Sequence, residues 1–119
     1  MDQLKIESLP GTHEGVRILR LHGPFTLREV FDFQAAFRAC NDPVTLVDLT
    51  DVPYMDSASL GAVMIVHTSS QRNHRKYALV GASDRLRTLF EVAGVGEILV
   101  TYPTVEEAQQ KLAAKASAS

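Results

Sequence analysis

The chain has 119 residues, of which 45% are hydrophobic and 22% charged, and these values are typical of one globular domain. Twelve basic and fourteen acidic residues give a net charge of -2, so no overall basic field attracts nucleic acid. The longest apolar run, Leu60 to Val66, is far shorter than the ~20 residues of a membrane helix. No signal pattern opens the sequence, so we expect a cytoplasmic protein without direct membrane insertion. A single cysteine, Cys40, excludes an intramolecular disulfide and a cysteine-based metal cluster.

The first third of the sequence predicts a β-hairpin followed by a helix. Residues 4–9 alternate apolar and polar side chains, as a half-buried strand does, and a Pro-Gly pair follows them. Residues 16–21 form the second predicted strand, with Val16, Ile18 and Arg20 on one face. Thr26 and Glu29 have the spacing of a capping box at the start of a helix. The Asn-Asp-Pro sequence at 41–43 ends this helix. Its predicted apolar face consists of Leu27, Val30, Phe33, Phe37 and Cys40.

The remaining sequence alternates strands and helices. The predicted elements are strands at 44–49, 77–81 and 97–101, and helices from Ser57, from Ser83 to Gly94, and from Thr104, the last with Val105, Ala108 and Leu112 inward. The strand at 44–49 is apolar on both faces, which favours a central position. Residues 113–119 have little to bury and are expected to fray.

The resulting order, β-β-α-β-α-β-α-β-α, predicts a single α/β domain over residues 1–119. Strands that alternate with helices after an opening hairpin imply a mixed, mostly parallel sheet. We expect about five strands and about four helices. The sequence has no internal repeat and no linker.

The segment from Val44 to Val66 predicts a buried strand, a short loop and a helix that begins at Asp56 and Ser57. The simplest interpretation is structural, because Asp and Ser are preferred at helix N-termini, where they bind free amides. The alternative is a phosphorylation site at Ser57. The amides and the positive end of the helix dipole favour negative charge, and phosphate adds roughly -1.5 to -2 charges. Local sequence alone makes the position suitable without choosing between the two.

The sequence from Leu49 to Gly61, LTDVPYMDSASLG, resembles the strand-loop-helix motif of STAS domains. It most resembles the motif of bacterial anti-sigma factor antagonists. Residues 77–81 and 86–95 look like the fourth strand and third helix of the same family. The resemblance therefore spans nearly the whole chain and implies an STAS-like fold.

The resemblance implies a protein-interaction switch in transcription regulation, not an enzyme or a cofactor-dependent protein. In the family, an anti-sigma factor with kinase activity phosphorylates the serine that follows the aspartate of the motif, and a metal-dependent phosphatase removes the phosphate. The unphosphorylated antagonist binds the anti-sigma factor and frees the sigma factor. By motif position, Ser57 is the predicted phosphorylation site. The predicted partner-binding residues are Thr26, Tyr54, Met55, Asp56, Ser57, Ala58, Ser59, Leu60 and Gly61.

Two positions depart from the family pattern. Ser59 stands where the family usually has glycine, so it adds a side chain where a partner is expected to approach the backbone closely. Thr26 stands in a loop that often carries an aspartate in the family, and its presence is expected to weaken kinase recognition or change the partner. Both departures favour the alternative of an STAS scaffold or subunit, in a stress-signalling or lipid-transport complex, that works without phosphorylation.

A serine hydrolase is a further alternative. Ser57 lacks the Gly-x-Ser-x-Gly elbow, however, and no motif places one of the four histidines beside it. His67 shares a helical face with apolar residues, so we expect a packed, hydrogen-bonded ring and no metal ligand. The basic run at 71–76 is expected at a solvated helix end, and Cys40 is expected to be buried and inert.

Overall fold

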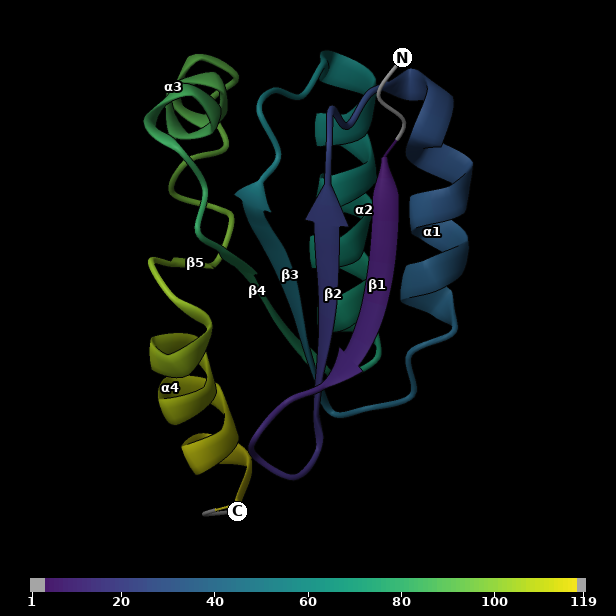
Figure 1. The fold of residues 1–119 in the computed structure, drawn as a ribbon. Coiled ribbons are helices and arrows are strands. Elements are labelled where there is room, and N and C mark those ends of the chain that lie inside the picture. Colours follow the sequence, from purple (N-terminus) through teal and green to yellow (C-terminus); the bar gives the residue numbers. More distant parts are fainter. Residues whose placement is uncertain (1–3, 118–119) are drawn as a thin grey trace.

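The computed structural model describes residues 4–117 and contains a five-stranded sheet with helices on both faces (Figure 1). The strands are β1 (Lys5–Pro10), β2 (Val16–His22), β3 (Val44–Asp51), β4 (Lys76–Val80) and β5 (Thr101–Tyr102). The helices are the 3-10 turn η1 (Leu27–Glu29), α1 (Val30–Arg38), α2 (Ser57–Arg72), α3 (Asp84–Val92) and α4 (Val105–Ser117). This order confirms the predicted fold class. No helix within residues 4–117 is long and apolar enough to cross a membrane.

The strands lie in the order β1-β2-β3-β4-β5. The β1–β2 hairpin is antiparallel and the other three pairs are parallel, as predicted. Residues 44–49 of β3 are all buried, because β3 is the central strand and is covered on both sides.

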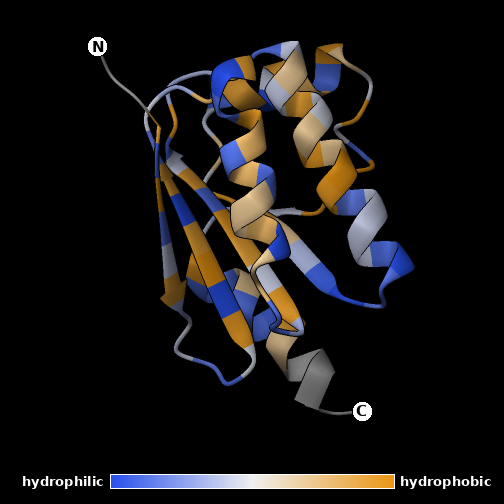
Figure 2. Cartoon of the chain, turned by 90° about the vertical axis from the view of Figure 1, so that its right-hand side faces the viewer, coloured by the Kyte–Doolittle hydropathy of each residue, from blue (hydrophilic) through white to orange (hydrophobic). Residues whose placement is uncertain are grey.

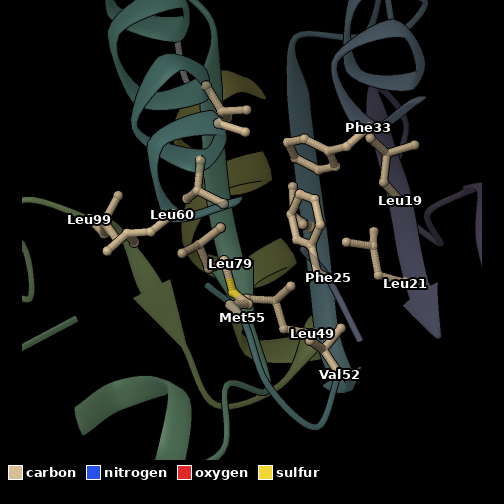
Figure 3. Packing of buried hydrophobic residues seen from close by; sticks show 14 of the residues in the cluster. Leu19, Leu21, Phe25, Phe33, Leu49, Val52, Met55, Leu60, Leu79 and Leu99 are labelled. Carbon is tan, nitrogen blue, oxygen red and sulfur yellow. The ribbon is translucent and has the colours of Figure 1, made fainter. Parts of the chain in front are cut away.

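Alternation along the strands divides the apolar side chains between two clusters. One cluster packs Leu19 and Leu49 of the sheet against Phe33 of α1 and Leu60 of α2 (Figure 3). The second cluster lies on the opposite face, under α4, and contains Val16, Ile18, Val44, Leu46, Ala108 and Leu112. Figure 2 shows hydrophobic and hydrophilic segments alternating along the helices, as expected when one side of each packs on the sheet.

Side chains cap the helix starts where the sequence predicts. The Glu29 carboxylate accepts hydrogen bonds from the amide and the hydroxyl of Thr26, both at 2.9 Å. The hydroxyls of Ser83 and Thr104 accept amide hydrogens at the starts of α3 and α4. Gly94 follows α3 with φ of 79°, a left-handed conformation that glycine adopts without strain.

The prediction that Leu27 faces the core is wrong. Its side chain is 63% exposed, because the helix starts as a 3-10 turn with a different periodicity from the α-helix behind it. Phe25 fills the core instead, and its ring lies 4.9 Å from that of Phe33, centroid to centroid (Figure 3).

The C-terminal elements also differ from expectation. The last strand is Thr101–Tyr102 and not 97–101, because the amides of Ile98 and Leu99 donate to the carbonyl of Val95 in a turn. Residues 113–117, expected to fray, are part of α4, and Ala113 is buried. Residues 118–119 lie outside the described residues.

Two other predictions about single residues are confirmed. The Nδ1 atom of His67 lies 2.7 Å from the Tyr77 hydroxyl, which also accepts the Val100 amide, so the histidine is packed and hydrogen-bonded. Cys40 is buried. Burial, together with the negative charge of Asp42, raises the pKa of its thiol and so disfavours the reactive thiolate.

Two phenylalanines of α1 provide a test of this packing. Phe33 is fully buried and Phe31 is 77% exposed. We expect Phe33→Ala to lower the free energy of unfolding by about 3 to 5 kcal/mol, because the substitution leaves a cavity. The matched Phe31→Ala should change it by no more than about 0.5 kcal/mol. Urea denaturation monitored by circular dichroism measures both, and equal effects would contradict the assigned orientation of α1.

Candidate functional site

The loop between β3 and α2 is held by a reciprocal cap. Asp56 is the N-cap of α2, and its Oδ1 accepts the Ser59 amide at 2.9 Å. The Ser59 hydroxyl accepts the Asp56 amide at 3.0 Å and donates to the Asp56 carbonyl at 2.9 Å. These bonds satisfy polar groups that the first turn of a helix otherwise leaves free. Ser57, the first residue of the helix, is exposed.

Asp56 also holds the start of the neighbouring helix. Its Oδ2 accepts the Leu27 amide of η1 at 3.0 Å. Next to this contact, the Phe25 amide donates to the Tyr54 carbonyl at 3.1 Å, and Phe25 forms a parallel bridge with Met55. The loop that contains Thr26 therefore lies beside the loop that contains Ser57.

These contacts favour the charged form of Asp56. Partial burial alone raises the pKa of the carboxyl group. Hydrogen bonds from the amides of Ser59, Leu27 and Ala58 and from the Ser59 hydroxyl outweigh burial and hold the pKa below its ordinary value of 3.8. The site therefore carries a fixed negative charge next to Ser57 at neutral pH.

The structure divides the nine predicted partner-binding residues into two groups. Met55, Ser59 and Leu60 are at most 7% exposed, and Met55 and Leu60 point into the core (Figure 3). The expectation that these three side chains lie at the interface is therefore corrected: they support the surface from beneath. The accessible residues are Thr26, Tyr54, Asp56, Ser57, Ala58 and Gly61.

The expected effect of Ser59 is also corrected. Its side chain is fully buried and closes the cap with Asp56, so it does not obstruct a partner. Gly61 is the open position, since a Cβ atom added there would have no neighbour within 4 Å. Close approach to the backbone of α2 is therefore possible at Gly61.

Arg85 is a neighbour of the site that sequence reasoning missed. Its guanidinium carbon lies 5.9 Å from the ring centroid of Tyr54, a distance suited to a cation–π interaction. The two residues are far apart in sequence, and no local pattern links them. The contact arises because α3 packs beside the loop.

The hydrogen bonds of two histidines lead away from Ser57. His67 contacts Tyr77, and the two ring nitrogens of His22 contact Glu7 and Asp51 at 2.6 and 3.0 Å. Within residues 4–117, no group of three His, Cys, Asp or Glu side chains is arranged to hold a metal ion. Neither His22 nor His67 is therefore paired with Ser57 as a base.

A family model described as STAS domain matches residues 10–108. This match covers most of the sequence, and the chain belongs to the STAS domain family. The anti-sigma-B factor antagonist of Listeria monocytogenes is 33% identical over 75 residues, which are 63% of this chain and 66% of the relative. The matched region is thus slightly less than two thirds of the relative's length.

Solved structures share the fold. The anti-sigma factor antagonist SpoIIAA in its unphosphorylated form aligns with a TM-score of 0.74 and 20% identity, covering 92% of this chain and 97% of that one. The phosphorylated form of the Bacillus protein aligns with a TM-score of 0.67 and 18% identity, covering 92% of this chain and 98% of that one. A sulfate transporter family protein from Wolinella succinogenes aligns with a TM-score of 0.72 and 22% identity, covering 88% of this chain and 86% of that one. One fold therefore serves regulators and transporters, and function has to be argued from the site.

Asp56 should stabilise the domain in a pH-dependent way. Loss of both caps in Asp56→Ala is expected to cost about 1 to 2 kcal/mol of unfolding free energy at pH 7. Because the folded state lowers the pKa of Asp56, its charge contributes fully above the ordinary value of 3.8, and the contribution disappears as pH falls through the lower, folded value.

Asp56→Asn provides the control, since it keeps one acceptor oxygen but cannot ionise. Denaturation curves from pH 7 to pH 2 should show that the wild type has a higher free energy of unfolding than Asp56→Asn, and that this difference shrinks below pH 3.8. An advantage that is constant over this range would contradict the role given to the charged carboxylate.

Proposed function

We propose that this chain is an anti-sigma factor antagonist that binds an anti-sigma factor through the β3–α2 loop and is released by phosphorylation at Ser57. The observation that carries the proposal is the exposed Ser57 at the start of α2, with Asp56 already bound to the nearby amides. Tyr54 and Gly61, before and after Ser57 along the chain, are exposed as well.

The occupied amides determine where a phosphate would act. At many helix starts, free amides bind an added phosphate. Here the Asp56 carboxylate holds the amides of Ser59 and Leu27, and its own charge repels a second anion. A phosphate on Ser57 would therefore extend from the surface toward the partner.

The proposed switch acts on affinity and leaves the fold intact. An outward phosphate with roughly -1.5 to -2 charges has to lose water when a partner docks, and it repels carboxylates there. If dehydration and repulsion together cost a few kcal/mol of binding free energy, the affinity falls at least a hundredfold. The partners in this scheme are an anti-sigma factor with kinase activity and a metal-dependent phosphatase. The chain itself is not an enzyme in this scheme, and we expect it to act in the cytoplasm.

The Listeria relative is named an anti-sigma-B factor antagonist, so a purified anti-sigma-B factor is the binding partner to test. Isothermal titration calorimetry should detect binding to the unmodified chain, and Ser57→Asp should weaken binding by about tenfold or more, since one interfacial charge clash is enough for that. Incubation with this factor, ATP and Mg²⁺ should add one phosphate to the wild type and none to Ser57→Ala, as measured by mass spectrometry.

Thr104→Asp is the matched control, because it adds the same charge at the start of α4, on the opposite face of the sheet. It should bind like the wild type. Binding that survives Ser57→Asp unchanged would support a scaffold that works without phosphorylation. Phosphate found at another residue would contradict the proposal that Ser57 is the phosphorylation site.

A further inference from the structure

An apolar surface that the core does not use begins beside Ser57. Leu27 of η1, Phe31 of α1 and Ile65 of α2 are 63%, 77% and 56% exposed. The two helices run side by side behind the sheet (Figure 1), and Asp56 ties η1 to the start of α2. We call Leu27, Phe31, Gly61 and Ile65 the α1–α2 face.

Helix geometry turns these side chains to the outer side of the two neighbouring helices. Phe31 lies roughly 160° around α1 from the fully buried Phe33, so it faces away from the sheet. In α2, Ile65 lies roughly 160° around from the fully buried Val63 and faces outward as well. The exposed side chains therefore form one surface across both helices.

The spacing of the α1–α2 face is helical along α2, where Gly61 precedes Ile65 by four residues. On the neighbouring helix, Leu27 of the 3-10 turn and Phe31 of α1 are the exposed apolar residues. Gly61 has open space above it, so a partner can approach closely between the apolar side chains. Helix surfaces have no free backbone edge for an added strand, whereas another helix can pack its side chains against them.

Charge defines the far end of the face. Arg38 ends α1 seven residues after Phe31, and Arg72 ends α2 seven residues after Ile65, so each arginine lies on the same side of its helix as the apolar residue. Both are exposed, and within residues 4–117 neither forms a salt bridge. The surface thus runs from Ser57, through apolar side chains, to two unpaired cations.

We propose that the α1–α2 face binds an amphipathic helix of the anti-sigma factor. The inference rests on the proposed function and adds the element of the partner that docks. Apolar residues of that helix pack on Phe31 and Ile65, and an acidic turn pairs with Arg38 and Arg72. Ser57 and Arg72 are fifteen residues apart on α2, or roughly 22 Å, which a helix of about fifteen residues spans.

The test measures the affinity of a purified anti-sigma-B factor for four variants. Phe31→Ala and Ile65→Ala should each weaken binding by about tenfold, the usual effect of truncating a central apolar contact. Val92→Ala is the matched control, since Val92 is 82% exposed but belongs to α3, and its affinity should equal that of the wild type. The double variant Arg38→Glu/Arg72→Glu should bind more weakly and with less loss on adding salt.

Hydrogen–deuterium exchange on the complex identifies the docking element. Protection of one amphipathic helix in the anti-sigma-B factor, lost with Phe31→Ala, would support the inference. Protection of a strand or a loop would overturn it. Wild-type affinity in Phe31→Ala and Ile65→Ala, with loss only in Ser57→Asp, would overturn the inference and leave the proposed function standing. No binding by the wild type would overturn the proposed function and the inference with it.

Discussion

The geometry of the site depends on the two hydrogen bonds that the Asp56 carboxylate accepts. One oxygen holds the Ser59 amide at the start of α2, and the other holds the Leu27 amide at the start of η1. Two helix starts that follow different strands are thereby fixed beside each other. Ser57 directly follows Asp56 and is exposed, so a negative charge added there would lie next to the charge that orders the loop.

Local interactions were the predictable part of the site and of the fold. The N-cap at Asp56, the contact of Thr26 with Glu29 and the caps at Ser83 and Thr104 connect residues three positions apart, so a short sequence window contains both partners. The central strand was predictable as well, because a fully apolar run bounded by turn residues has few alternatives. The family motif then predicted a phosphorylation site at Ser57, which local physics alone leaves as an ordinary helix start.

Contacts between distant segments were not predictable. The second bond of Asp56 reaches Leu27, twenty-nine residues away, and depends on β2 and β3 being parallel neighbours. The exposure of Leu27 depends on a 3-10 turn that helical periodicity does not reveal. The run at 60–66 is apolar all round, so its pattern could not indicate that Ile65 faces outward.

The division between buried and exposed residues separates the part of the loop that holds the fold from the part that is accessible. Met55, Ser59 and Leu60 anchor the loop from inside, whereas Ser57 and Gly61 on the same segment face outward. A charge added to exposed Ser57 keeps its water in the free chain and would lose it when a partner docks there. The departure at Ser59 strengthens this arrangement, because its hydroxyl closes the cap that glycine would leave open. One hydrogen-bond network thus orders the loop and leaves Ser57 exposed.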